Sequence, residues 1–299
     1  MLILGLAIFV SVLMPLYAVY VAWSARSGGR LGYGLKALAA LGFMGFLTLI
    51  ARWDVLTVYL LYFWWALIGV LLLAGLLAMR DRRWIEGEKR GTLLAAAVEP
   101  AIGLGLFGYV ALGLFPGSDP VDLQWPLGEG RYIVGQGGNS AMLNYHNAHA
   151  QQRYALDIVA LDAFGRRADG VSPEAMAAYI VYGMPVLAPC AGEVVAAVDG
   201  MPDTPIGGSN GEAPAGNHVI LRCAGLDITL AHLRAGSVAV SARQTVSAGQ
   251  RLGEVGSSGN STEPHLHIHA VPEGSGEDGE GVPLSFGGRF PVRGSIIDG

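Results

Sequence analysis

Four long apolar segments near the start of the chain limit what it can fold into more than any other feature of its sequence. They cover about residues 2–23, 31–50, 55–79 and 92–115. An α-helix rises about 1.5 Å per residue, so each segment can cross a hydrocarbon core of roughly 30 Å. Lys36 and Glu99 are the charged residues within them. We therefore predict an α-helical membrane domain with four transmembrane helices over residues 1–116, embedded in the lipid bilayer.

The first segment could instead be a cleaved signal peptide. Such a peptide needs a basic region before its apolar stretch and a cleavage site of small residues. The segment lacks a basic region before Leu2 and has no clear cleavage site, and three more apolar segments follow it. A first transmembrane helix is the better interpretation.

Charges and histidines divide the chain at the same place. Residues 1–116 hold nine basic and five acidic residues, whereas residues 117–299 hold ten and nineteen, together with all seven histidines. Charged residues make up 14% of the chain, against about 25% in ordinary soluble domains. This composition excludes an ordinary cytosolic enzyme, a disordered chain and a nucleic-acid-binding protein. Residues 117–299 are predicted to form a separate domain with its own core.

The loops between the apolar segments predict the orientation in the membrane. Basic residues gather in residues 24–36 and 80–91, whereas the short loop 51–54 balances Arg52 against Asp54. Basic loops stay in the cytoplasm. With four spans, the N-terminus and residues 117–299 then lie on the extracytoplasmic, or periplasmic, side of the cytoplasmic membrane.

One carboxylate lies inside the fourth span. Glu99 allows either a helix-packing role or a part in transport or sensing, and no other feature of the sequence supports a protein partner in the membrane. The sequence indicates neither an oligomeric state nor a reason for four helices where one would anchor the chain.

Short apolar runs separated by glycine-rich turns mark the second domain and predict a mainly antiparallel β fold. The runs are residues 185–187, 193–198, 218–223, 227–233, 237–240, 251–255 and 265–271. One helix is predicted over residues 173–182, with Ser172 as its N-cap. Cys190 and Cys223 can form a disulfide in an oxidising compartment, or can remain two separate buried thiols.

The strongest chemical signal is the sequence His265-Leu266-His267-Ile268-His269. Alternate side chains of a strand share a face, so three imidazoles would lie on one face while Leu266 and Ile268 enter the core. A strand rises about 3.3 Å per residue, which places His269 too far along to replace His267. We expect His269 beside the centre or at its rim.

Further candidate residues lie upstream. A catalytic zinc site usually has three ligands from His, Cys and carboxylate side chains, plus a water molecule. His146 precedes Asp157 by eleven residues, and Asp157 begins an apolar run through residue 161. His232 alternates with apolar neighbours at the end of a predicted strand, whereas His218 begins a strand and is assigned a structural role.

Together these segments resemble the zinc metallopeptidases of the M23 type, which include lysostaphin. The resemblance runs from about residue 134 to 283 and is carried by several motifs besides the histidines. These are Pro-Val-Leu-Ala-Pro at 185–189, Gly-Asn-His-Val at 216–219, Ala-His-Leu at 231–233 and the glycine-rich residues 256–262. It implies a β-sheet fold with a groove, and an endopeptidase that hydrolyses the peptide cross-links of bacterial cell-wall peptidoglycan.

The resemblance also implies roles for individual residues. His146, Asp157 and His267 would bind Zn²⁺, and His232 and His265 would be the two catalytic histidines that are not ligands. A catalytically silent module, which recruits or activates another cell-wall hydrolase, is the alternative function. All five positions are filled, which favours the enzyme, although the bond that is cleaved does not follow from the sequence.

The first ligand departs from the usual pattern of the family. That pattern is His-x-x-x-Asp, but the residue four before Asp157 is Arg153. This chain resembles instead a variant with Asn-x-His and a longer spacer. On that pattern His146 is the ligand, and His149 is the alternative.

Overall fold

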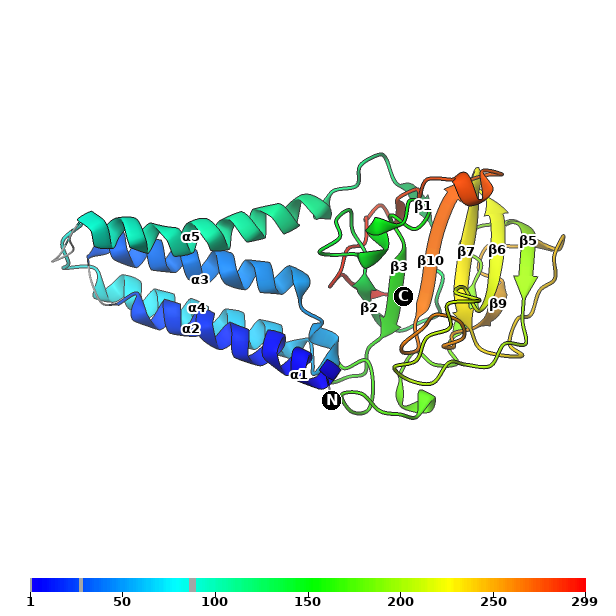
Figure 1. Cartoon of the computed structure of the whole chain (residues 1–299), viewed down its shortest axis with the longest axis horizontal. Helices are drawn as coiled ribbons and strands as arrows, with labels where there is room; N and C mark the ends of the chain where they lie inside the picture. Colours follow the sequence, from blue (N-terminus) through cyan, green and yellow to red (C-terminus); the bar gives the residue numbers. More distant parts are fainter. Residues whose placement is uncertain (1, 27–28, 86–89) are drawn as a thin grey trace. The chain divides into compact units, whose positions relative to one another are not determined.

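The computed structural model describes residues 2–26, 29–85 and 90–299. The chain divides into two units, Met1–Leu112 and Gly113–Gly299, which are treated separately here. The first unit is helical and the second is built on an antiparallel β-sheet (Figure 1). The predicted fold class is therefore confirmed.

The first unit consists of helices joined by short connections. They are α1 (Leu2–Ile8), a π-helical turn (Phe9–Leu13), α2 (Met14–Ser24), α3 (Arg30–Ile50), α4 (Tyr59–Ala78) and α5 (Arg90–Ala111), with 3₁₀ turns at Trp53–Val55 and Leu112–Leu114. Within the described residues, four stretches are long and apolar enough to cross a membrane: Gly5–Ser24, Arg30–Ile50, Tyr59–Ala78 and Leu94–Leu114. Each lies within a few residues of a predicted span.

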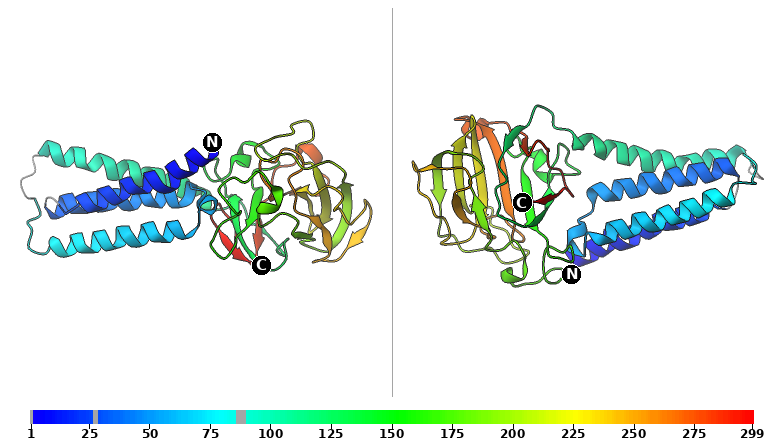
Figure 2. Two further views of the ribbon diagram at one scale, coloured as in Figure 1. Left: turned by 90° about the horizontal axis from the view of Figure 1, so that it is seen from below. Right: turned by 180° about the vertical axis from the view of Figure 1, so that it is seen from behind.

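Close packing between α3 and α5 depends on glycine. The helices run side by side in every view (Figures 1 and 2). A Cβ atom placed on Gly42 would lie 2.8 Å from the backbone of Gly103, and one on Gly45 would lie 2.9 Å from the ring of Phe107. Small residues are favoured at such contacts because lipid supplies little driving force for association, so that helices depend on close contact.

Polar groups in this unit are bonded locally. The Trp64 indole donates to the carbonyl of Ser11 within the π-helical turn at 3.0 Å. Arg30 donates to the carbonyls of Met79 and Arg80, the end of α4 where a cation complements the helix dipole. Glu99 accepts a hydrogen bond from Tyr17, which fits the helix-packing interpretation of this carboxylate.

The second unit has a main sheet of eight strands in the order β12-β2-β3-β10-β7-β6-β5-β8, with antiparallel neighbours throughout. The strands are β2 (Arg131–Gln136), β3 (Leu156–Ala160), β5 (Gly192–Val198), β6 (Asn217–Cys223), β7 (Leu226–Leu233), β8 (Thr245–Val246), β10 (Leu266–Pro272) and β12 (Ile296–Asp298). Two smaller pairs flank it: β1 (Val121–Leu123) with β11 (Leu284–Phe286), and β4 (Pro185–Leu187) with β9 (Arg251–Glu254).

Strand β10 lies between β3 and β7 and sets the register of the sheet centre. His267 is paired with Asp157 on one side and with Ala231 on the other. Leu266 and Ile268 are fully buried in the apolar core, as predicted from the alternation. Their burial fixes the opposite face of β10 as the one that carries the histidines.

Two predicted elements are absent from the described residues. Of the predicted helix over residues 173–182, only a 3₁₀ turn at Met176–Ala178 forms. Instead, the N–H of Asp169 donates to the carbonyl of Ala178, and the N–H of Ile180 donates to the carbonyl of Arg167. Residues 237–240 are not a strand, because the carboxylate of Asp199 accepts the N–H groups of Gly236 and Val238.

Cys190 and Cys223 are joined by a disulfide, with their Cα atoms 6.2 Å apart. The bond connects the segment before β5 to the end of β6. Of the two alternatives left open by the sequence, the structure has the cross-link.

Candidate metal centre

Three predicted residues from distant parts of the chain meet at one point. Asp157 lies on β3, His267 on β10, and His146 on a 3₁₀ turn (Tyr145–Ala148). Nε2 of His146 and Nδ1 of His267 each lie 3.0 Å from Oδ1 of Asp157. All three side chains are buried. One carboxylate oxygen thus lies between two imidazole nitrogens.

This arrangement fits a zinc ion. Zinc binds His nitrogen and carboxylate oxygen at about 2.0–2.2 Å, so two ligands of a tetrahedral ion lie about 3.4 Å apart. The ligand atoms of His146, Asp157 and His267 all lie within 4.8 Å of one another. Two neutral nitrogens and one anionic oxygen form a donor set typical of catalytic zinc, and small shifts would bring them to ligand distance.

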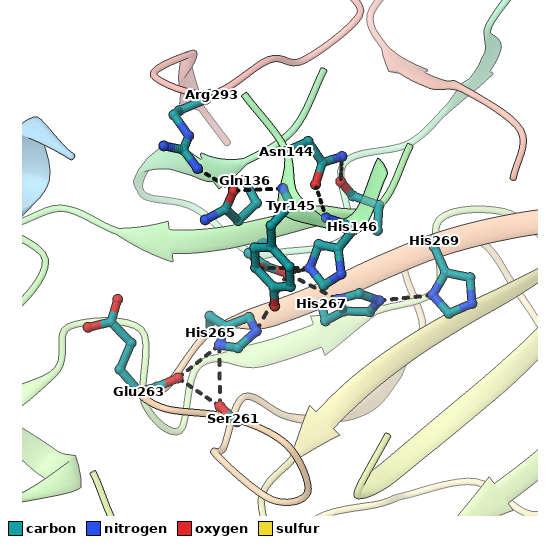
Figure 3. Close-up of polar contacts among 12 residues, drawn as sticks. Gln136, Asn144, Tyr145, His146, Ser261, Glu263, His265, His267, His269 and Arg293 are labelled. Carbon is teal, nitrogen blue, oxygen red and sulfur yellow. Dashed lines mark hydrogen bonds and ion pairs between the residues drawn. The ribbon is translucent and has the colours of Figure 1, made fainter. Parts of the chain in front are cut away.

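Asn144 holds the turn that carries His146 (Figure 3). Its side-chain oxygen accepts the backbone N–H of His146 at 3.1 Å. Its amide nitrogen contacts the carbonyls of Gly138, Arg153 and Ala155 at 3.0–3.3 Å. Asn144 is fully buried. It therefore closes the long loop between His146 and Asp157, which explains how a spacer longer than the usual one still brings the two side chains together.

His232 and His265 lie beside the three residues, and each ring is held by a backbone carbonyl. Nδ1 of His232 lies 2.8 Å from the carbonyl oxygen of Ser258, and Nδ1 of His265 lies 2.8 Å from that of Glu263. A carbonyl can only accept, so Nδ1 carries the proton in both rings. Nε2 is consequently the unprotonated nitrogen of each neutral ring.

The backbone around His232 is tightly constrained. His232 has φ +62°, a left-handed conformation that is costly for a residue with a side chain and is found mainly at functional sites. Its N–H donates to Ala215 and its carbonyl accepts from Gly256. A Cβ atom on neighbouring Gly216 would lie 2.4 Å from the backbone of Ser258, so this close approach requires glycine.

Nε2 of His265 is a buried polar atom without a hydrogen-bond partner among the described residues. It lies 3.5 Å from Oδ1 of Asp157. A buried nitrogen of this kind costs free energy unless something else binds there. An ion, or a water molecule beside it, would satisfy this atom.

His146, His232 and His267 line a cavity of about 340 Å³. Its lining combines imidazoles with neutral polar and small side chains: Tyr145, His146, His149, Gln152, Pro214, Ala215, Thr229, Ala231, His232, Asn260, His267 and His269. The Tyr145 ring stacks on His146, with ring centroids 4.0 Å apart. Burial and the charge of Asp157 raise the pKa of the Tyr145 phenol, so it remains a hydrogen-bond donor.

The electrostatics favour an ionised Asp157 and neutral rings at His232 and His267. Burial by itself would raise the pKa of Asp157, but His265, His146 and the contacts with His146 and His267 hold it well below its usual range. Burial lowers the pKa of His267, and burial with two neighbouring imidazoles lowers the pKa of His232 well below its usual value. An ionised carboxylate and unprotonated imidazoles are the states that bind zinc.

The remaining histidines differ in position. Two groups of possible metal ligands occur among the described residues: His146, Asp157 and His267, and also His232, His265 and His267. His149 lines the cavity but belongs to neither group. Nδ1 of His218 is bonded to the carbonyl of Gly216. His269 lies next to His267, and burial lowers its pKa to about 3.

Sequence analysis missed the carbonyls of Ser258 and Glu263 and the position of Tyr145. The backbone of Glu263 is held in turn by its side chain, which pairs with the buried Arg167 at 2.7 Å. The Asn-x-His spacing was the one signal in the sequence that pointed to the role of Asn144.

A buried carboxylate between two imidazoles, with two further imidazoles held by carbonyls, fits the centre of a metallopeptidase. The comparison with known families agrees, because the profile of Peptidase family M23 matches residues 174–278. Residues 174–278 of the second unit thus match a Peptidase family M23 domain. The matched segment includes His232, His265 and His267 and begins after His146 and Asp157, whose place in the site is seen in the geometry described above.

Solved structures of this kind are similar to the chain at low identity. They include a mutant catalytic domain of the prophage-encoded M23 protein EnpA from Enterococcus faecalis (25% identity, 43% of this chain, 72% of that chain, TM-score 0.27). The antimicrobial peptidase lysostaphin from Staphylococcus simulans is 20% identical over 56% of this chain and 52% of that chain, with a TM-score of 0.32. A zinc-containing peptidase from Vibrio cholerae is 17% identical over 54% of this chain and 37% of that chain, with a TM-score of 0.28.

This chain thus spans about half of the lysostaphin structure and less of the Vibrio protein. A search among curated proteins found no match.

Proposed function

We propose that this protein is a membrane-anchored zinc endopeptidase that hydrolyses peptide cross-links of bacterial peptidoglycan. The observation that carries the proposal is the convergence of His146, Asp157 and His267 at one point beside His232 and His265. The first three would hold the ion and the last two would handle protons. The match to family M23 supports a peptidase acting on the cell wall.

When bound, zinc supplies Lewis acidity, which polarises a scissile carbonyl and acidifies a water molecule. Because His232 and His265 carry their protons on Nδ1, each offers Nε2 as a base. One ring accepts the proton of the attacking water and later delivers it to the leaving amine. The other takes up a proton from the solvent on Nε2, donates it in a hydrogen bond to the developing oxyanion, and returns it to the solvent when the intermediate collapses. The Tyr145 hydroxyl at the cavity edge is a further donor for a substrate carbonyl.

We propose that the peptidase domain lies outside the cytoplasmic membrane. The basic residues of 24–36 and 80–91 favour a cytoplasmic location for those loops. Four candidate spans then return the chain to the side of its N-terminus. The Cys190–Cys223 disulfide supports this orientation, because disulfides persist in oxidising compartments. The cell wall is on that side.

The test uses the purified full-length protein in detergent, its zinc content per chain, and the release of new amino groups from purified peptidoglycan. We expect about one zinc per chain and measurable hydrolysis. His267→Ala should lose both zinc and hydrolysis, whereas His232→Ala should keep zinc and lose hydrolysis. His218→Ala is the control and should keep both.

Two results would contradict the proposal. Unchanged zinc and turnover in His267→Ala would remove His267 from the centre. A zinc-free wild-type protein that binds peptidoglycan without cleaving it would instead favour a module that recruits or activates another hydrolase.

A further inference from the structure

The second histidine of β10, His269, contacts the proposed ligand His267 directly. Nδ1 of His269 lies 2.9 Å from Nε2 of His267, and the two rings are inclined by 72° (Figure 3). On the neighbouring strand β7, His269 is paired with Thr229. Residues two apart on a strand share a face, which brings His269 to the same side of the sheet as the metal centre.

The position of His269 excludes a direct role as a ligand in this arrangement. His269 belongs to neither cluster of metal-ligating atoms among the described residues, and its Nδ1 is already in contact with His267. The opposite nitrogen of His267, Nδ1, is the one that faces Asp157. The two nitrogens of His267 therefore have different partners: Nδ1 faces the carboxylate of Asp157 and Nε2 faces His269.

An imidazole nitrogen that binds a metal ion must be unprotonated, so the single proton of the neutral ring has to reside on the other nitrogen. For His267 this means a proton on Nε2, where the acceptor within reach is Nδ1 of His269. We propose that His269 is a positioning residue for the zinc centre, which accepts the Nε2–H of His267 and thereby keeps Nδ1 free for the ion.

The inference rests on the proposed zinc site and adds a residue to it. Partners of metal-bound imidazoles fix the ring orientation and the tautomer, and their loss typically weakens metal binding 10- to 100-fold. Without His269, the ring of His267 could rotate, or could protonate Nδ1 and bond directly to Asp157. Either change would make Nδ1 of His267 unavailable to the ion.

The experiment measures the zinc dissociation constant of the full-length protein in detergent by competition with a chromophoric chelator. The wild type is compared with His269→Ala, His269→Gln and the control His218→Ala, whose imidazole bonds the carbonyl of Gly216. We expect a 10- to 100-fold weaker constant for His269→Ala. His269→Gln should recover most of the affinity, because the amide oxygen can accept from His267. His218→Ala should match the wild type.

A purely structural role would lower the melting temperature of the metal-free protein in both His269 variants, without rescue of zinc affinity by glutamine. If His269→Ala does not fold, His269→Met replaces it as a variant of similar bulk without an acceptor nitrogen. Zinc affinity within threefold of the wild type in the alanine or methionine variant would overturn the inference. A wild-type protein that binds no zinc would overturn the proposed function itself.

Discussion

At the residue scale, the site depends on side chains and carbonyls that fix the histidines. Asn144 ties the turn of His146 to three carbonyls, and the carbonyls of Ser258 and Glu263 fix the tautomers of His232 and His265. None of these groups would contact the scissile bond. They determine whether the five reactive side chains meet.

Asn144→Ala should therefore weaken zinc binding and destabilise the second unit. The substitution leaves the carbonyls of Gly138, Arg153 and Ala155 without this donor, and an unpaired buried polar group costs about 1–3 kcal/mol. The measurements are zinc affinity and thermal unfolding. Asn147→Ala is the matched control on the same turn, because its buried amide nitrogen has no hydrogen-bond partner among the described residues. Equal effects of the two substitutions would contradict this role.

The stability of the metal-free protein should fall as the pH drops below about 6.5. The pKa values of His232, His267 and His269 are lowered in the folded state, to about 3 for His269. The unfolded chain binds protons near pH 6.5 and the folded chain does not, so acid favours unfolding. Each such group contributes up to about 1.4 kcal/mol per pH unit.

Thermal unfolding of the chelator-treated protein between pH 7.5 and pH 5 tests this dependence, and His269→Gln should flatten it. The lowered pKa of Asp157 adds its own loss of stability only below its unfolded pKa, near 3.8. A melting temperature that does not change over this range would rule out neutral, buried imidazoles in the folded state.

The proximity of the candidate residues was largely predictable from the sequence, and the groups that hold them in place were not. The period-two alternation of His265, His267 and His269 placed them on one strand face, because that pattern depends on local geometry alone. Which histidine precedes Asp157 in the site was left between His146 and His149. That choice depends on a loop closed by Asn144, and bonds to the carbonyls of residues 138, 153 and 155 leave little trace in composition.

At the element scale, long segments and segments with strong periodicity were predicted correctly. The predictions were wrong where a side chain forms hydrogen bonds with the backbone. The bounds of the long apolar helices and of the strands β6, β7 and β10 were predicted within a few residues. The strand predicted over residues 237–240 does not form, because the carboxylate of Asp199 accepts backbone N–H groups of this segment. The short edge strands β8 and β12 were missed, since two or three residues give no measurable alternation.

Gly42→Ala in α3 should destabilise the helical unit, by about 1–3 kcal/mol as for other overpacked sites. The new Cβ atom would lie 2.8 Å from the backbone of Gly103, which can yield only if the helices separate. Gly34→Ala is the control in the same helix, because no atom lies within 4 Å of its Cβ position. Thermal stability in detergent compares the two, and equal melting temperatures would contradict close packing of α3 on α5.

At the scale of the whole molecule, the charge of the loops, the four candidate spans and the disulfide all bear on one question, the side of the membrane on which the peptidase unit lies. Each argument depends on different physics: insertion of basic residues, helix length and redox chemistry. An extracytoplasmic peptidase unit is consistent with all of them.

In intact cells, a carboxy-terminal epitope should be accessible to an impermeant probe, and Cys190 and Cys223 should resist thiol labelling until reduced. Cys190→Ser should then lower stability by about 3–4 kcal/mol, because the bond closes a loop with a sequence separation of 33. Free thiols in freshly isolated protein, or an epitope protected by the membrane, would place the unit in the cytoplasm.

The central place of β10 also determines when the enzyme can become active. His267 lies on β10, which begins directly after His265, and contacts an aspartate 110 positions earlier. A growing or truncated polypeptide that stops before His265 has neither the complete proposed ion site nor both proposed proton carriers, however well its earlier strands pair. The proposed centre can therefore form only after β10 has been synthesised, later than all four hydrophobic helices.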